Sequence, residues 1–403
     1  MVAGRGFGGS MGYSELQTTT GEKLRPRFRE IYGQEPELYR APGRVNLIGE
    51  HTDYNDGYVF PAAIDLFTWI AIAPNPDKAI RVRSENVHES VEFGVDSVAL
   101  GLLPKEPWSR YVSGVAQALE QNGHALRGAN VLIQGEVPIG AGVSSSAALE
   151  VAVGYALLAN AGARIPCRKL AQLCQRAEND FVGTRCGIMD QLASACSTQD
   201  HALLLDCRSL EFRMVRVPSE LRLVICNTMV KRELASSAYN TRRAECELGV
   251  CILAQRFPGV RALRDVTFDQ LESCRATMPP NVYKRCRHVV RENQRVLFAA
   301  DALDRHRLDD LARAMAESHA SLRDDYEVSC AELDLLVDLA ARQKGVHGSR
   351  MTGAGFGGCT INLVEAHAVD AFRDGVSAGY QKRTGLAPDI FICNAANGVT
   401  RVE

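Results

Sequence analysis

The stretch VPIGAGVSSSAALEVAV, residues 137–153, constrains the fold of this 403-residue chain most strongly. Apolar residues at its start are typical of a strand end, and the small apolar residues after its serines favour a long helix. Gly140 and Gly142 permit the left-handed backbone of a tight turn and let a ligand approach the main chain. The three serines at 144–146 are suited to cap the helix. The stretch therefore predicts the end of a strand, a glycine-rich turn and a long helix.

The amino terminus of this predicted helix is a candidate anion site. A helix start has unpaired N–H groups and a partial positive charge, which favours an anionic ligand by about 0.3–1 kcal/mol at an exposed site. We interpret residues 140–146 as a phosphate cradle built without a lysine, because the pattern Gly-x4-Gly-Lys-Ser/Thr is missing from the sequence. An ordinary helix that begins with good caps is the alternative.

A cluster of charged residues surrounds a short apolar run in APGRVNLIGEHTDYNDG, residues 41–57. Arg44 precedes the run, and Glu50, His51 and Asp53 follow it. Carboxylates and an imidazole at a strand end can bond adjacent hydroxyl groups of a sugar. An arginine nearby can offset charge on a transferring phosphoryl group. A charged turn with Arg44 in a surface ion pair is the alternative.

Two further carboxylates are candidates for a role in the chemistry. Asp190 follows a glycine and two apolar residues in CGIMDQ, where it could be a general base or, as the residues alone favour, a helix cap. Glu178 lies on the polar side of an expected helix, where it is either a solvated glutamate or a ligand of Mg²⁺. That ion takes one or two protein oxygens and keeps several waters.

A second glycine cluster, MTGAGFGGCTINLV, contains a formal Gly-x-Gly-x-x-Gly at Gly353, Gly355 and Gly358. A dinucleotide-binding motif follows a strand and opens a helix, whereas this cluster opens an expected strand at 359–364. We therefore interpret it as a glycine-rich turn, either beside a ligand or simply tight. An NAD-dependent oxidoreductase is disfavoured for the same reason.

Composition removes several classes of protein from consideration. The net charge of −2 gives no bulk attraction to nucleic acid or to anionic membranes. The 13 cysteines, odd in number and without Cys-x-x-Cys spacing, predict buried free thiols rather than a disulfide framework or a metal site. Residues 1–23 lack the apolar core of a signal peptide and predict a mobile tail. We expect a cytoplasmic monomer that acts on small molecules.

The order of expected elements predicts an α+β fold in two lobes, since strands and helices mix without strict βαβ alternation. Residues 24–207 are expected to form the first lobe, which contains the charged cluster and the phosphate cradle. Residues 208–403 are expected to form the second lobe, in which helical patterns dominate from 236 to 344.

Together, these stretches resemble the galactokinase branch of the GHMP sugar and metabolite kinases. GRVNLIGEHTDYNDG resembles the galactokinase signature, PIGAGVSSSAA the ATP-binding motif and TGAGFGGC the third motif, in family-like order and spacing. The resemblance runs from about residue 25 to the C-terminus, and Val143 stands where the family usually has leucine. It implies a ribosomal-S5-domain-2-like first lobe and a ferredoxin-like second lobe, with the active site between them.

The resemblance also implies a reaction and its residues: phosphorylation of the anomeric hydroxyl of α-D-galactose by MgATP, which gives α-D-galactose 1-phosphate and ADP. Asp190 would be the catalytic carboxylate, and Arg44 would assist the transfer. The implied sugar-binding residues are Arg44, Glu50, His51, Thr52, Asp53, Gly187, Asp190 and Tyr239. The implied ATP-binding residues are Gly140, Ala141, Gly142, Val143, Ser144, Ser145 and Ser146. Ser146 and Glu178 would hold Mg²⁺.

Two neighbouring functions within the family stay open. An N-acetylgalactosamine kinase shares the motifs and differs in the room around the sugar C2 substituent. A galactose sensor binds the sugar without turnover and can carry a damaged second motif. The serine run at 144–146 is intact here and Asp190 is present, which favours an enzyme over a sensor.

Overall fold

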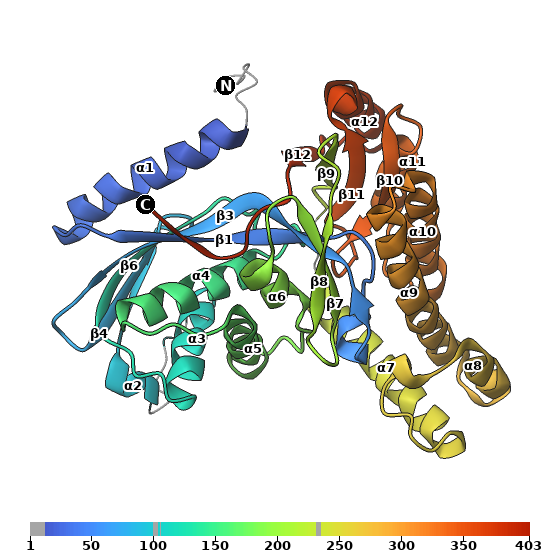
Figure 1. Cartoon of the computed structure of the whole chain (residues 1–403), viewed down its shortest axis with the longest axis horizontal. Coiled ribbons are helices and arrows are strands. Elements are labelled where there is room, and N and C mark those ends of the chain that lie inside the picture. The colour runs from blue at the N-terminus through green and yellow to red at the C-terminus, as the bar shows by residue number, and fades with distance from the viewer. Residues whose placement is uncertain (1–12, 100–103, 105, 231–234) are drawn as a thin grey trace.

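The computed structural model describes residues 13–99, 104, 106–230 and 235–403, and it has two lobes (Figure 1). A six-stranded sheet with helices on both faces forms the first lobe, and a four-stranded sheet beside long helices forms the second. This arrangement confirms the predicted α+β fold class. None of the helices formed by the described residues is both long and apolar enough to span a bilayer.

The first lobe is built on the sheet β13-β1-β3-β6-β4-β5. Its strands are β1 (Glu37–Asn46), β3 (Pro61–Pro74), β4 (Ala79–Ser84), β5 (Glu89–Gly94), β6 (Ala129–Gly135) and β13 (Thr400–Val402). Its helices are α1 (Tyr13–Tyr32), α2 (Val95–Ala99), α3 (Ser109–Gln121), α4 (Ser145–Asn160), α5 (Cys167–Ala177) and α6 (Met189–Cys196). Neighbouring residues of a strand point to opposite faces, so Trp69 packs against Phe28 of α1 whereas Ile70 packs with Val115 and Val151 of α3 and α4.

The second lobe is built on the antiparallel sheet β10-β11-β9-β12. Its strands are β9 (Leu221–Asn227), β10 (Val346–Thr352), β11 (Cys359–Glu365) and β12 (Asp389–Cys393). Its helices are α7 (Ala235–Arg256), α8 (Phe268–Cys274), α9 (Pro280–Asp304), α10 (Leu308–Ser321), α11 (Ala331–Ala340) and α12 (Val369–Thr384). A small sheet of β2 (Tyr58–Val59), β7 (His201–Asp206) and β8 (Phe212–Arg216) completes the fold.

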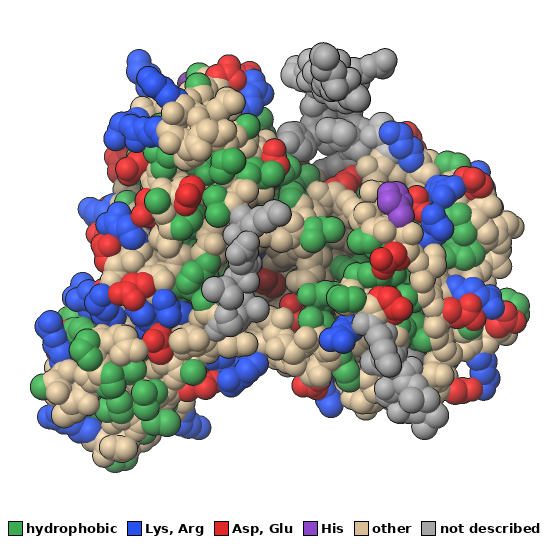
Figure 2. Space-filling model, turned by 180° about the vertical axis from the view of Figure 1, so that it is seen from behind, with side chains coloured by type: hydrophobic (Ala, Val, Ile, Leu, Met, Phe, Trp, Pro, Cys, Tyr) green, Lys and Arg blue, Asp and Glu red, His purple; other side chains and the backbone are tan. Residues whose placement is uncertain are grey.

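One buried hydrophobic cluster contains residues of both lobes. Leu47 and Phe60 of the first lobe belong to the same buried cluster as Val296 and Leu303 of α9 and Ile361 of β11. The apolar run after Arg44 therefore has a packing role, because it anchors the charged loop that follows it between the lobes. Seen from behind, the surface is hollowed between the two halves (Figure 2).

The structure differs from the predicted segment boundaries in three places. Helix α1 already begins at Tyr13, so the expected tail cannot extend to residue 23. Gly21, Leu24 and Phe28 of this helix pack on the sheet at Trp69. Residues 1–12 of that tail lie outside the described part. The boundary expected between residues 207 and 208 falls inside the hairpin of β7 and β8, and β13 returns to pair with β1 in the first lobe.

The cysteines also differ from the prediction. Cys167, at the start of α5, and Cys196, at the end of α6, form a disulfide. The two residues are 29 positions apart in sequence, a spacing that matches no short motif, and the packing of α5 on α6 brings them together. The other 11 cysteines form no disulfide, and most of them are buried, as predicted.

The shared core predicts that the lobes unfold together. Leu47→Ala should destabilise the protein by roughly 2–5 kcal/mol, because it leaves a cavity at a fully buried position. We would follow urea denaturation by tryptophan fluorescence and by far-UV circular dichroism. Both tryptophans, Trp69 and Trp108, lie in the first lobe, whereas the dichroism reports helices of both lobes.

The two probes should give coincident transitions, both shifted to lower urea in the variant. Leu297→Ala on α9 is the control, because Leu297 is 42% exposed and its truncation should change stability by less than about 0.5 kcal/mol. Separate transitions for the two probes would contradict a common core.

Candidate active site

A cavity of about 200 Å³ lies where segments far apart in the sequence meet. Its walls come from β1, the loop after β1, the segment between α5 and α6, the start of α6, helix α7 and the turn after β10. The lining includes seven residues that were expected to contact the sugar: Arg44, Glu50, His51, Asp53, Gly187, Asp190 and Tyr239. It also includes Glu178, Thr184, Cys186, Met189, Gly353 and Ala354. The turn of the third motif therefore meets the charged cluster.

Thr52 is the expected sugar contact that does not line the cavity. Its side chain is buried, and its hydroxyl lies 2.8 Å from the Gly49 carbonyl oxygen and 2.6 Å from that of Tyr58. A hydroxyl has a single hydrogen, so it donates to one of these two acceptors at a time. The structure thus places this side chain inside the loop, where it holds the loop closed instead of facing a ligand.

Arg44 and Asp190 form a bidentate ion pair at the edge of the cavity. Arg44 donates from Nε and Nη2 to the two Asp190 oxygens at 2.9 Å each, and from Nη1 to the Gly142 carbonyl oxygen at 2.8 Å. The Arg44 side chain is only 6% exposed and that of Asp190 is 28% exposed. The surface ion pair considered for Arg44 and the helix cap considered for Asp190 are both wrong. The Arg44 side chain is buried, and Asp190 lies within the first turn of α6 instead of capping it.

The glycine–serine loop has the predicted strand–turn–helix context, with left-handed backbone at Gly140 and Gly142. The serines do not act as predicted, however. Ser144, at the N-cap of α4, is itself left-handed with φ 62°, and its side chain makes no capping hydrogen bond. The Ser144 hydroxyl instead donates to Asp190 Oδ2 at 2.6 Å. The loop is therefore connected directly to the carboxylate that faces the cavity.

Glu178 is buried rather than solvated, in contrast to one of the two alternatives that the sequence left open. Its Oε2 accepts a hydrogen bond from Gln191 Nε2 at 2.7 Å, and the same amide donates to Glu150 at 3.0 Å. Burial, together with the charge of Asp190, raises the pKa of Glu178 to about 7. Burial also raises the pKa of Glu150 well above its usual value, and the neighbouring Glu178 adds to this effect.

Glu150 and Gln191 are members of the site that the motifs do not reveal. A charged residue within the small and apolar residues of the 145–160 segment was the available signal for Glu150, since such a residue is rarely buried without a partner. Gln191 follows Asp190 directly and carries no signal of its own. Its importance arises only because α6 packs beside the helices that carry the two glutamates.

Asp53 and Gly187 lie against each other in the wall of the cavity. A Cβ atom added to Gly187 would overlap Oδ2 of Asp53, so only glycine leaves room for this carboxylate. The other oxygen, Oδ1, accepts a hydrogen bond from the Tyr54 amide at 3.0 Å. Burial, reinforced by the charge of Asp190, raises the pKa of Asp53 to about 6.

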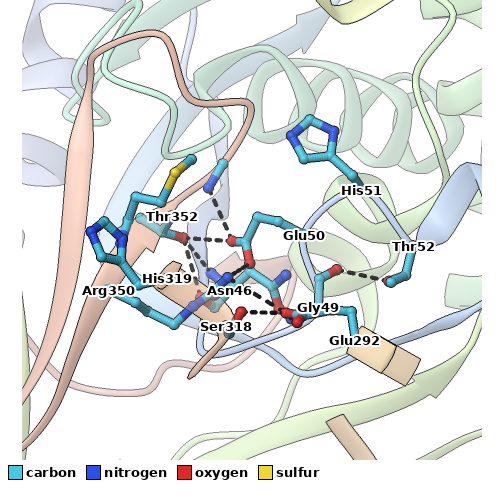
Figure 3. Close-up of polar contacts among 12 residues, drawn as sticks. Asn46, Gly49, Glu50, His51, Thr52, Glu292, Ser318, His319, Arg350 and Thr352 are labelled. Carbon is cyan, nitrogen blue, oxygen red and sulfur yellow. Dashed lines mark hydrogen bonds and ion pairs between the residues drawn. The ribbon is translucent and has the colours of Figure 1, made fainter. Parts of the chain in front are cut away.

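Glu50 and His51 connect the charged loop to the third-motif turn. Glu50 Oε1 accepts from the Gly353 amide at 3.1 Å and lies 3.3 Å from the Thr352 hydroxyl, and the carboxylate forms an ion pair with Arg350 (Figure 3). His51 has a left-handed backbone, and its ring lies between the Tyr54 hydroxyl at 2.8 Å and the carbonyl oxygen of residue 354 at 3.3 Å. Burial lowers the pKa of His51 to about 3, so its ring is neutral.

Family models match three stretches of the chain, which together include all residues that line this cavity except Tyr239. The galactokinase galactose-binding signature matches residues 26–74, the GHMP kinase N-terminal domain matches residues 110–198, and the GHMP kinase C-terminal domain matches residues 299–382. Fold and site together therefore define an ATP-dependent kinase of the GHMP class.

Comparison with individual proteins narrows the class. A galactokinase from Roseiflexus sp. (strain RS-1) is 49% identical over 384 residues, which are 95% of this chain and 97% of that protein. A galactokinase from Chloroflexus aggregans is 48% identical over 376 residues, with coverage of 93% and 96%. The crystal structure of Lactococcus lactis galactokinase complexed with galactose superposes with a TM-score of 0.91 at 38% identity and covers 95% of this chain and all of that one. The chain belongs to the galactokinases, the GHMP kinases that use ATP to phosphorylate galactose.

The contact between Gly187 and Asp53 gives a sharp test of the cavity. Gly187→Ala should weaken galactose binding by about tenfold or more, because the displaced Asp53 carboxylate would lose the charge-assisted hydrogen bond of roughly 1.5–3 kcal/mol that we expect it to form with the sugar. Isothermal titration calorimetry with galactose alone would measure the dissociation constant.

Gly94→Ala is the control for that measurement. Gly94 ends β5 away from the cavity, and a Cβ there would approach nothing closer than the Ser97 hydroxyl oxygen at 3.2 Å. Its galactose affinity should match that of the unmodified protein. If Gly187→Ala also binds galactose normally, then Asp53 is not held against Gly187 in solution.

Proposed function

We propose that the chain transfers the γ-phosphoryl group of ATP to the anomeric hydroxyl of α-D-galactose, which gives α-D-galactose 1-phosphate and ADP. The observation that supports this reaction best is the double attachment of Arg44. Its guanidinium pairs with Asp190, which faces the cavity, and it also donates to the carbonyl oxygen of Gly142 in the glycine–serine loop. A hydroxyl in the cavity and a phosphate on the loop would thus meet at one guanidinium.

A second cavity of about 140 Å³ adjoins the other side of the loop and suits the base of the nucleotide. It is lined largely by apolar side chains, with Ser145 and Ser146 at one end and Trp108, Tyr111 and Leu149 around it. A flat aromatic base fits such surroundings. With the base there, the phosphates would extend along residues 140–146 toward Asp190, close to the unpaired N–H groups of the first turn of α4.

In the sugar cavity, the residues divide by chemistry. Asp53 and Glu50 would accept hydrogen bonds from galactose hydroxyls, and Gly187 leaves the room for Asp53. Tyr239, whose ring centroid lies 5.6 Å from that of His51, would form one wall. His51 would shape this wall, since both ring nitrogens already contact protein atoms. Thr52 would support the loop from within.

The mechanism follows from how Asp190 is held. Phosphoryl transfer depends mainly on positioning and on stabilisation of charge. Asp190 would accept or orient the proton of the attacking hydroxyl, and Arg44 and Ser144 would fix the direction of its oxygens. Arg44 would also offset the negative charge that develops on the transferring group.

The residues near the helix start fit Mg²⁺. The Ser146 hydroxyl is close enough to the Glu178 carboxylate to oppose the rise in its pKa, so one neutral and one acidic oxygen lie near each other beside the loop. Mg²⁺ prefers such oxygens and keeps waters and phosphate oxygens as its other ligands. We propose that Ser146 and Glu178 hold the ion, which would neutralise phosphate charge when bound.

Comparing turnover with galactose and with N-acetylgalactosamine would distinguish a galactokinase from an N-acetylgalactosamine kinase. The galactose-binding signature and the names of the relatives favour galactose. A non-catalytic sensor is disfavoured because the serine run is intact and Ser144 contacts Asp190 directly. We also propose that the protein is a monomer; light scattering should give the monomer mass of 44.0 kDa.

Asp190→Asn tests the reaction. It should lower turnover by about 10²–10⁴-fold, because the amide cannot accept the proton, and should leave galactose binding within a few-fold. A coupled assay of ADP release and calorimetry with galactose measure the two effects. Asp180→Asn, at an exposed position near Glu178, is the control and should be fully active. Turnover of Asp190→Asn close to that of the unmodified protein would refute the assignment.

The raised pKa of Asp53 predicts that galactose affinity depends on pH. A carboxyl with a pKa of about 6 is ionised at neutral pH and takes up a proton below pH 6, where it loses part of its capacity to accept sugar hydroxyls. The galactose dissociation constant should therefore be flat above about pH 7 and rise as the pH falls through 6.

Asp53→Asn should bind galactose more weakly and remove this inflection. Calorimetry without nucleotide at several pH values would measure both effects. An inflection that survives near pH 7 in Asp53→Asn would assign the pH dependence to Glu178, whose pKa is about 7. That result would be evidence against ionised Asp53 as a sugar ligand.

A further inference from the structure

Four charged side chains of alternating sign lie behind the sugar cavity: Glu50, Arg350, Glu292 and Arg295. Glu50, Arg350 and Glu292 are almost completely buried, with exposures of 1%, 0% and 0%. Arg350 Nη2 forms an ion pair with Glu50 and lies 3.7 Å from Glu292 Oε1. On its other side, Glu292 pairs with Arg295 at 2.6 Å. The two positive and two negative charges balance.

Helix α9 of the second lobe contacts the loop that contains Gly49 and Glu50 through the side chains of Glu292 and His288. Glu292 Oε1 accepts a hydrogen bond from the Gly49 amide at 3.0 Å, so it fixes the residue immediately before Glu50 (Figure 3). One helical turn earlier, His288 Nε2 lies 3.1 Å from the Glu50 carbonyl oxygen. The loop that carries the sugar ligands is therefore held by side chains that do not themselves line the cavity.

The Glu50 carboxylate retains limited capacity for a ligand. Its Oε1 already contacts the Thr352 hydroxyl and the Gly353 amide, and its Oε2 contacts Arg350. A carboxylate has about four acceptor positions, so one remains for a sugar hydroxyl. Where that position points depends on the guanidinium behind it, because Arg350 Nη2 pairs with Oε2 while Arg350 Nη1 donates to the Asn46 carbonyl oxygen at 3.2 Å, which fixes the plane of the guanidinium.

We propose that Arg350 and Glu292 are positioning residues of the sugar site, which hold the Glu50 carboxylate in the orientation that a galactose hydroxyl requires. This inference rests on the proposed role of Glu50 as a sugar ligand. Arg350 acts through Glu50, and Glu292 acts through both Arg350 and the Gly49 amide. The ATP cavity contains none of these residues, so the effect should be confined to the sugar.

Because the residues are buried, the experiment must separate positioning from folding. Arg350→Met alone leaves two buried carboxylates and one guanidinium, which should destabilise the protein. The double variant Arg350→Met/Glu292→Gln removes one charge of each sign and should recover much of the lost stability. Arg350→Lys keeps the charge and adds a second, milder variant, because a lysine cannot reproduce the contacts that two guanidinium nitrogens make with Glu50 and with the Asn46 carbonyl oxygen.

The double variant and Arg350→Lys should each bind galactose about tenfold or more weakly, the loss expected when one charge-assisted hydrogen bond is misaligned. The KM for galactose should rise, whereas kcat at saturating galactose and the KM for ATP should change less than about twofold. The control Arg305→Met/Asp301→Asn removes an exposed ion pair at the end of α9 and should change nothing.

Glu50→Gln completes the test. If Arg350 acts through Glu50, then adding Glu50→Gln to the double variant should weaken galactose binding no further than Glu50→Gln alone. Fully additive losses, or normal galactose affinity in a folded double variant and in Arg350→Lys, would overturn the inference. Failure of the unmodified protein to bind galactose in the same assay would instead refute the proposed function.

Discussion

The guanidinium of Arg44 holds the two halves of the reaction site together. The three guanidinium nitrogens donate to Asp190 and to the Gly142 carbonyl oxygen. The backbone amide of Arg44 donates to the Val143 carbonyl oxygen at 3.1 Å. One residue of β1 therefore fixes both the glycine–serine loop and the start of α6. The apolar residues after Arg44 anchor this strand in the core that both lobes share, so the site is only as rigid as that core.

The third motif reaches the same place from the second lobe. A Cβ atom at Gly353 would lie 2.7 Å from the carbonyl oxygen of Gly142, and the φ of Gly353 is 83°, so close approach and backbone conformation both require glycine. The Gly353 amide also donates to Glu50. The second glycine cluster is thus a contact between lobes. Its resemblance in spacing to a dinucleotide motif has no functional meaning here, because the cluster precedes a strand, β11.

Sequence patterns predicted those features that depend on residues close together in the chain. The glycine turn and helix within residues 137–153 and the grouping of Arg44 with the acidic loop follow from residue spacing and backbone preferences, whereas the strand before them, β6, already ends at Gly135. The partners of Glu50 do not, since Arg350 and Glu292 lie more than 240 positions along the chain. Nor could the sequence show that Thr52 turns inward, or that Ser144 contacts Asp190 instead of capping α4, because hydroxyls satisfy either role equally well.

Two buried arginines, Arg44 and Arg350, show that the same type of ion pair can have different roles. The partner of Arg44, Asp190, is 28% exposed and faces the cavity, so it can exchange part of its hydrogen bonding for a substrate at moderate cost. The partner of Arg350, Glu50, is 2% exposed in its side chain and is enclosed by second-lobe atoms. Separating that pair would leave an uncompensated buried charge, which commonly costs 3–5 kcal/mol. Exposure of the carboxylate, rather than the identity of the cation, therefore decides which pair can take part in chemistry and which can only hold a geometry.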